Sequence, residues 1–149
     1  MEGNKLRFRS EAARFFVNGG WLEEHLYRLC LSLKKSTPIQ DVGQGIEVER
    51  EVRHQPVRNE LDVAFLANNR LYIIECKTKL FKSGSGGSEA LFKLDTLTDL
   101  LGGLQARGML VSFQPLRDAD LRRAADLRIE VCCGSELVEL TSRIERWVQ

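Results

Sequence analysis

Two apolar segments separated by a short polar break constrain the fold of this chain most strongly. Residues 59–66 read Asn-Glu-Leu-Asp-Val-Ala-Phe-Leu, and residues 71–77 read Leu-Tyr-Ile-Ile-Glu-Cys-Lys. The Ala-Asn-Asn-Arg sequence between them is a turn signal, so the pattern predicts two adjacent antiparallel strands. The continuous apolar run at the start of the second segment is typical of a strand that is buried on both faces.

The charged residues of these segments are expected to lie close together. Side chains alternate between the two faces of a strand, so Glu75 and Lys77 share one face and Cys76 points to the other. Glu75 and Lys77 are then about 6.6 Å apart along the strand. If the first strand presents Asp62 to the same face, the three charged side chains converge.

Such a trio suits the hydrolysis of a phosphodiester. Two neighbouring carboxylates repel each other, and an apolar environment makes each harder to ionise. A hard divalent cation relieves that repulsion, lowers the pKa of a bound water and neutralises phosphate charge. A lysine beside it holds or deprotonates the attacking water, or stabilises the developing charge. The alternative is that Glu75 and Lys77 form a solvated ion pair of little energetic value.

The arrangement Asp62…Glu75-x-Lys77 resembles the signature of the PD-(D/E)xK nuclease superfamily, although Glu60 and Leu61 precede the aspartate in place of proline. Four segments in the same order, residues 18–24, 59–63, 71–78 and 90–95, resemble the nuclease domain of the DUF1887 family. Proteins of that family are CRISPR-associated ancillary nucleases, usually with an N-terminal CARF domain that senses cyclic oligoadenylate. The resemblance runs from about residue 15 to the C-terminus.

The resemblance implies an α/β fold with a restriction-endonuclease-like αβββαβ core, in which helices flank a mixed central sheet, followed by an extra C-terminal strand and helices. It also implies a site in which Glu23, Asp62 and Glu75 bind one or two Mg²⁺ or Mn²⁺ ions. The backbone carbonyl of Cys76 completes the metal shell, and Lys77 positions or activates the water.

Glu23 is the candidate from the expected first helix. The Gly19-Gly20 pair breaks the chain, and residues 21–35 then carry leucines at helical spacing. Glu23 borders this apolar stripe, whereas Glu24 points nearer to solvent. The alternative role for Glu23 is to complement the positive N-terminus of the helix.

Five further side chains are candidates for contacting nucleic acid: Lys79, Lys82, Lys93, Arg58 and Gln55. The first two follow the second strand and either form a basic lip for backbone phosphates or are simply solvated. Lys93 either faces the site and touches phosphate or is a solvated lysine of a helix. Arg58 and Gln55 lie in what reads as a connection before the Asp62 strand.

The remaining elements follow from periodicity and breakers. Residues 46–52 alternate as a half-exposed strand, whereas residues 37–45, with one proline and two glycines, are expected to be a loop. Further helices are expected at 88–101, 117–127 and 135–148, and further strands at 109–113 and 128–132. Residues 1–17 are assigned to an N-terminal extension or linker, in which a short helix from Ser10 is possible, and residues 18–149 to the nuclease domain.

Composition narrows the classes of function. The formal net charge of +1 gives no global basic signal, so nucleic acid would be held by a local patch. No apolar run approaches a membrane span and no signal-peptide core is present, which predicts a soluble, cytoplasmic protein without membrane partners. The four cysteines form no Cys-x-x-Cys pair, so neither a zinc site nor a disulfide is expected.

The sequence therefore predicts a metal-dependent endonuclease that hydrolyses phosphodiester bonds in DNA or RNA, in CRISPR-linked or other anti-phage defence. The resemblance implies a substrate of single-stranded RNA or DNA, nicking of duplex DNA, and a homodimer. It also implies an upstream CARF domain if this chain is an excised domain. The alternatives are a catalytically inactive nuclease-like module that binds nucleic acid, and a structural or toxin-partner subunit in which the charged residues are only salt bridges.

Overall fold

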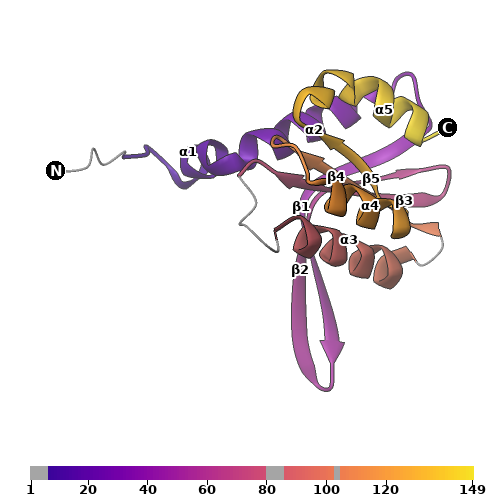
Figure 1. Cartoon of the computed structure of the whole chain (residues 1–149). Helices are drawn as coiled ribbons and strands as arrows, with labels where there is room; N and C mark the ends of the chain where they lie inside the picture. Colours follow the sequence, from indigo (N-terminus) through magenta and orange to yellow (C-terminus); the bar gives the residue numbers. More distant parts are fainter. Residues whose placement is uncertain (1–6, 80–85, 103–104) are drawn as a thin grey trace.

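A computed structural model describes residues 7–79, 86–102 and 105–149 of the chain (Figure 1). The strands are β1 (Ile39–Val52), β2 (Gln55–Ala67), β3 (Arg70–Lys77), β4 (Arg107–Ser112) and β5 (Glu130–Cys133). The helices are α1 (Glu11–Phe15), the π-helical segment η1 (Phe16–Gly20), α2 (Trp21–Leu33), α3 (Gly86–Gly102), α4 (Asp118–Asp126), the 3₁₀ segment η3 (Gly134–Glu139) and α5 (Leu140–Trp147).

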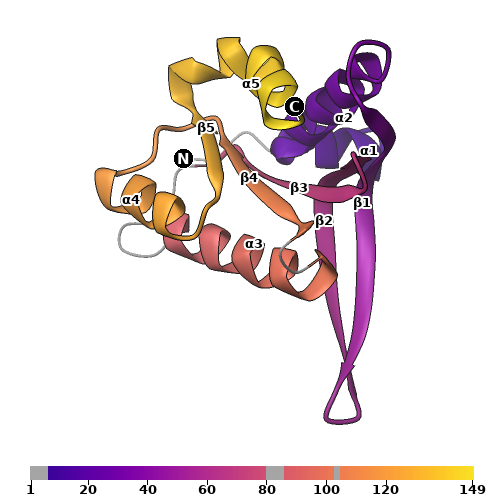
Figure 2. The ribbon, with the colours of Figure 1, turned by 90° about the vertical axis from the view of Figure 1, so that its right-hand side faces the viewer.

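The five strands form one mixed sheet in the order β1-β2-β3-β4-β5. Strand β2 runs antiparallel to both of its neighbours, β1 and β3, and β4 and β5 run parallel to β3. Helices α2 and α5 cover one face of the sheet, and α3 and α4 cover the other (Figures 1 and 2). This is the restriction-endonuclease-like architecture that the sequence predicts.

Strand β3 is the centre of both hydrophobic layers. Tyr72, Ile74 and Cys76 pack in the cluster beneath α2 and α5, whereas Ile73 packs in the cluster beneath α3. A strand that is covered on both faces must be apolar on both, which explains the continuous run in its sequence. The alternation predicted for residues 71–77 is therefore confirmed.

The turn between β2 and β3 is also as predicted. Asn68 and Asn69 adopt left-handed conformations with φ of 52° and 59°. Both central residues of a type I′ hairpin turn need positive φ, and asparagine tolerates it better than most residues. Asn68 also donates a side-chain hydrogen bond to the Val148 carbonyl at 3.0 Å, which ties the turn to the C-terminus.

The first hairpin corrects two sequence expectations. Strand β1 begins at Ile39, where a loop was expected through residue 45, because residues 39–44 pair with the buried end of β2. Gln55 and Arg58 lie within β2 and not in a connection. The turn between the strands is formed by Arg53 and His54, with φ of 50° and 62°, a pair that gives no turn signal in the sequence.

This long hairpin projects away from the rest of the molecule (Figure 2). Strand β2 pairs with β3 only through residues 63–67, so residues 55–61 are paired with β1 alone. The hairpin therefore consists of a buried base inside the sheet and an arm that extends beyond it.

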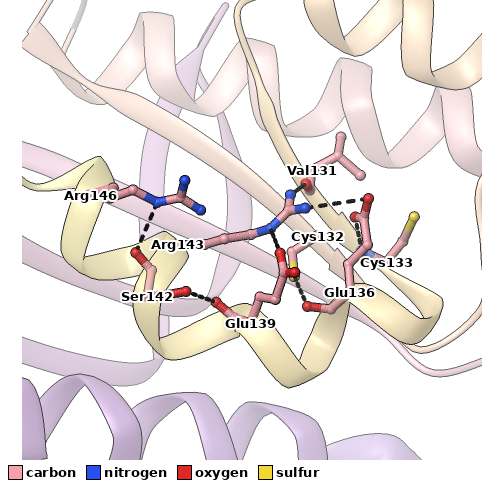
Figure 3. Close-up of polar contacts among 8 residues, drawn as sticks. All are labelled: Val131, Cys132, Cys133, Glu136, Glu139, Ser142, Arg143 and Arg146. Atoms are coloured by element: carbon pink, nitrogen blue, oxygen red, sulfur yellow. Dashed lines mark hydrogen bonds and ion pairs between the residues drawn. The ribbon is translucent and has the colours of Figure 1, made fainter.

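The C-terminal helix expected over residues 135–148 is divided into η3 and α5, and Arg143 joins both to the edge strand β5 (Figure 3). Its guanidinium donates a hydrogen bond to the Val131 carbonyl at 2.8 Å. It also forms ion pairs with Glu136 at 3.3 Å and Glu139 at 3.5 Å. Arg143 thus occupies a backbone acceptor on the edge strand and fixes the C-terminal segment against the sheet.

A short helix begins after Ser10, whose side chain accepts a hydrogen bond from the backbone N–H of Ala13. All four cysteines are free. Among the described residues, no helix has the length and apolar character needed to cross a membrane.

Docking of α3 on the sheet predicts a strong asymmetry between two leucines of that helix. Leu94 is fully buried, so Leu94→Ala should lower the free energy of unfolding by about 2–5 kcal/mol in urea titrations, through lost burial and the cavity left behind. Leu100 is 46% exposed, and Leu100→Ala should change stability by no more than about 0.5 kcal/mol. Equal losses for the two variants would show that α3 is not packed as described.

Candidate active site

The candidate site lies where β2 and β3 separate. The last paired residues of these strands on that side are Val63 and Ile74. Just beyond them, Asp62 Oδ2 accepts a hydrogen bond of 2.8 Å from the backbone N–H of Cys76. The carboxylate thus takes the place of a strand carbonyl, and it fixes Asp62 next to the Glu75-Cys76-Lys77 segment.

Strand β2 changes its orientation at Asp62. Leu61 belongs to the cluster beneath α3, whereas Val63, two residues later, belongs to the cluster beneath α2 and α5. In regular alternation the two side chains would share a face. Gly45, with φ of 58°, lies opposite Asp62 between the paired residues of β1 and β2. The backbone therefore twists at this point, and the simple alternation assumed from the sequence does not hold through Asp62.

Glu75 is the most buried charged residue of the site. It is 1% exposed, and both its oxygens are engaged by lysines. Lys77 Nζ lies 2.9 Å from Oε1, and Lys93 Nζ lies 2.9 Å from Oε1 and 2.8 Å from Oε2. This contact is therefore not the solvated surface pair that the sequence left as an alternative. The position of Lys93 is resolved too, because the side chain faces the site from α3.

Glu23 approaches from the opposite layer, near the N-terminal end of α2. It lines a pocket of about 210 Å³ with residues from the α1–η1 segment and from the end of β3 and the two residues after it, namely Phe15, Asn18, Gly19, Gly20, Cys76, Lys77, Thr78 and Lys79. Gly19 has φ of 121°, and a Cβ there would collide with the Thr78 side chain. The predicted chain break at glycine therefore brings the beginning of α2 against the exit of β3.

Two acids of the site, Glu23 and Asp62, lack enough positive charge around them. Burial, followed by repulsion from Asp62, Glu60 and Glu75, raises the pKa of Glu23 to about 7. Burial and repulsion from Glu75 raise the pKa of Asp62 to about 6, although the Cys76 hydrogen bond opposes the shift. Burial raises the pKa of the Cys76 thiol, and the nearby carboxylates of Asp62, Glu23 and Glu75 add to that effect.

Lys77 has the opposite balance. Burial lowers its pKa, but attraction to Glu75, the hydrogen bond with Glu75 and the attraction of Asp62 outweigh that effect. Its pKa is therefore raised, and the amine carries its proton at neutral pH. Lys77 is thus a hydrogen-bond donor to Glu75.

The side chains of the site offer the type of ligand atom that a hard divalent cation prefers. These atoms are carboxylate oxygens, and burial together with mutual repulsion raises the pKa values of Glu23 and Asp62, an effect that a bound cation would oppose. Within residues 7–79, 86–102 and 105–149, no three His, Cys, Asp or Glu side chains are grouped as a ready ligand set. Instead, two lysines neutralise Glu75, and Asp62 is bound to the backbone.

Of the other residues predicted to contact nucleic acid, some lie at the site and others lie far along the hairpin arm. Lys79 lines the pocket, whereas Lys82 lies outside the described residues. Arg58 is on the projecting arm and pairs with Glu49 at 2.7 Å, and Gln55 is beside the turn of that arm. The sequence analysis did not single out Asn18 and Thr78, which also line the pocket. Both residues lie in segments that carry the family resemblance, residues 18–24 and 71–78, which was the signal for them.

The sheet order and its helical layers define the restriction-endonuclease-like class of folds. The small subunit of the heterodimeric restriction endonuclease R.BspD6I shares this fold, with a TM-score of 0.55 at 12% sequence identity. That alignment covers 87% of this chain and 71% of the other chain.

The sequence itself identifies the family. Residues 10–149 match the family described as Card1-like, endonuclease domain, so this chain belongs to that family. It is similar to the Vibrio cholerae protein VC1899, with 45% identity and a TM-score of 0.88 over 95% of this chain and 37% of that one. It is also similar to Can2 from Sulfobacillus thermosulfidooxidans, solved in complex with cyclic tetra-adenylate, with 33% identity and a TM-score of 0.81 over 95% of this chain and 39% of that one.

The chain therefore spans less than two-fifths of the length of these two relatives. A comparison with curated proteins gave no match.

The raised pKa of Asp62 predicts a pH-dependent effect of Asp62→Asn in chelator. Asparagine keeps an oxygen for the Cys76 N–H but removes the charge. Since the folded pKa of about 6 exceeds the ordinary value of 3.8, the charge destabilises the folded state above pH 6, and this penalty disappears below 3.8. The variant should be more stable at pH 8, by about 1–2 kcal/mol after allowing for solvent screening.

Urea unfolding between pH 8 and pH 4 measures this difference, which should shrink as the pH falls. Asp126→Asn, at an exposed position of α4, is the matched control and should show no such trend. A variant less stable than the wild type at pH 8 would contradict the electrostatic description of the site.

Proposed function

We propose that this chain is a metal-dependent endonuclease that hydrolyses phosphodiester bonds in DNA or RNA. The observation that carries the proposal is the meeting of Asp62, Glu75 and Lys77 at the opening between β2 and β3. In this proposal Glu23, Asp62 and Glu75 are the metal-binding side chains, with the Cys76 carbonyl as a further ligand. Membership of an endonuclease-domain family supports the same reaction class.

In this proposal the lysines of the site have separate roles in the hydrolysis beside the bound metal. Bound Mg²⁺ or Mn²⁺ would supply a water of lowered pKa and neutralise charge on the phosphate. The protonated Lys77 would orient the attacking water and donate to the phosphate oxygens as charge develops. Lys93 would balance the charge of Glu75 before substrate arrives and offer a second cation to the phosphate. Lys79, at the exit of β3, would contact the backbone of the substrate.

The wider role is proposed from the relatives. Because the chain corresponds to a part of VC1899 and Can2, we propose that it acts with an upstream CARF sensor domain in a homodimer. The cyclic tetra-adenylate in the Can2 structure supports cyclic oligoadenylate as the activating signal. The corresponding biological role is CRISPR-linked defence in the cytoplasm.

A digestion panel of single- and double-stranded DNA and RNA, with Mg²⁺, Mn²⁺ or chelator, tests the proposed activity. Cleavage should require a divalent ion, and Asp62→Asn and Lys77→Met should each lower the rate at least about 100-fold. Asp126→Asn and the exposed Lys34→Met are controls of the same chemical change and should cleave as the wild type does.

Two alternative outcomes distinguish the competing functions. Binding of nucleic acid without cleavage under any of these conditions would support an inactive nuclease-like binding module. Neither binding nor cleavage would leave the charged residues as structural ion pairs. Cleavage that is unaffected by both substitutions would place the active site elsewhere.

A further inference from the structure

A half-exposed aromatic ring stands beside the candidate site. Phe113 directly follows β4, and its backbone N–H donates a hydrogen bond of 2.8 Å to the carbonyl of Lys77. The residue is 50% exposed. Phe113 therefore lies at the same edge of the sheet as the lysine proposed to contact the substrate phosphate.

The surroundings of Phe113 hold it in place. Ser112 is fully buried, and its hydroxyl donates to the Gln114 carbonyl at 2.7 Å, which fixes the backbone on both sides of the phenylalanine. The ring also packs perpendicular to Trp21 of α2, with the centroids 5.7 Å apart and an interplanar angle of 84°. Trp21 lies two residues before Glu23, so the aromatic pair joins the layer that carries Glu23 to the end of β4.

Exposed apolar residues are common on protein surfaces, so exposure alone carries no argument. Phe113 differs because it is exposed, held in place and joined through its backbone to Lys77 at the end of β3. Lys77 and Lys79 lie along the exit of the neighbouring strand, and Lys79 is exposed. Aromatic rings next to cations are the components of surfaces that bind single-stranded nucleic acid, in which bases stack on rings while cations bind phosphates.

We propose that Phe113, supported by Trp21, is a stacking surface for an unpaired nucleobase that flanks the scissile phosphate. This inference rests on the proposed nuclease function and adds a base-binding subsite to it. A base inside a duplex already has neighbours on both faces, so this subsite would take a base that is unpaired or turned out of its helix. Stacking is tolerant of base identity, so the subsite would select for accessibility and not for sequence.

Binding measurements separate stacking from support of the fold. In an Asp62→Asn background with Mg²⁺, the affinity for a fluorescent single-stranded oligonucleotide is measured by anisotropy for Phe113→Ala, Phe113→Leu and Phe113→Trp. One stacked base contributes about 1–3 kcal/mol, so Phe113→Ala and Phe113→Leu should weaken binding about 5- to 150-fold. Phe113→Trp keeps an aromatic ring and should bind as tightly as the background protein. Phe92→Leu, at a 48% exposed position on α3, is the matched control and should bind as the background does.

A series of oligonucleotides, each lacking one base, then locates the contact. At the position that stacks on Phe113, removal of the base should abolish the difference between phenylalanine and alanine, and elsewhere the difference should persist. If leucine binds as well as phenylalanine, or if the alanine penalty is the same for every oligonucleotide, the subsite does not exist. If those results accompany normal metal-dependent cleavage, the nuclease proposal stands and only the stacking is wrong. A background protein that binds no nucleic acid contradicts both.

Discussion

The enclosure of Glu75 between two lysines is the interaction on which the rest of the site depends. A carboxylate that is 1% exposed would carry a large desolvation cost without charged partners. One partner, Lys77, belongs to the same strand, but the other, Lys93, is supplied by α3. The burial of this acid therefore depends on the docking of α3 on the sheet. The hydrophobic layer beneath α3, with Leu91 and Leu94 fully buried, provides that docking. Fold and site are thus coupled through one helix.

Within the described part of the chain, one acid of the site is paired with lysines and two are not, and this difference is the physical basis of the functional proposal. Glu75 is neutralised, whereas Glu23 and Asp62 have raised pKa values because burial and mutual repulsion are not compensated. A purely structural ion-pair network would be expected to lower the pKa values of its acids, as Arg117 does for the buried Asp120 on α4. Perturbed acids beside a pocket are more typical of a functional site. The pairing of β2 with β3 ends beside Asp62, and Glu23 lines the neighbouring pocket.

The sequence predicted the parts of this structure that depend on local chemistry. The apolar run of β3, the Asn68-Asn69 turn and the shared face of Glu75 and Lys77 all follow from alternation and turn preferences. The beginning of β1 was missed because pairing with a buried strand overrides the loop signals of Pro38, Gly43 and Gly45. The contact between Lys93 and Glu75 was left open because the rotation of a docked helix is set by packing. The pairing of Trp21 with Phe113 joins residues far apart in the chain, and no local pattern indicates it.

Crystallography with Mn²⁺ and a single-stranded oligonucleotide tests the central claim most directly. Anomalous scattering should locate manganese against the carboxylates of Asp62 and Glu75, beside the Cys76 carbonyl. Manganese bound elsewhere, or no manganese with Glu75 still enclosed by Lys77 and Lys93 while the oligonucleotide is bound, would contradict the assignment of this site as the catalytic centre.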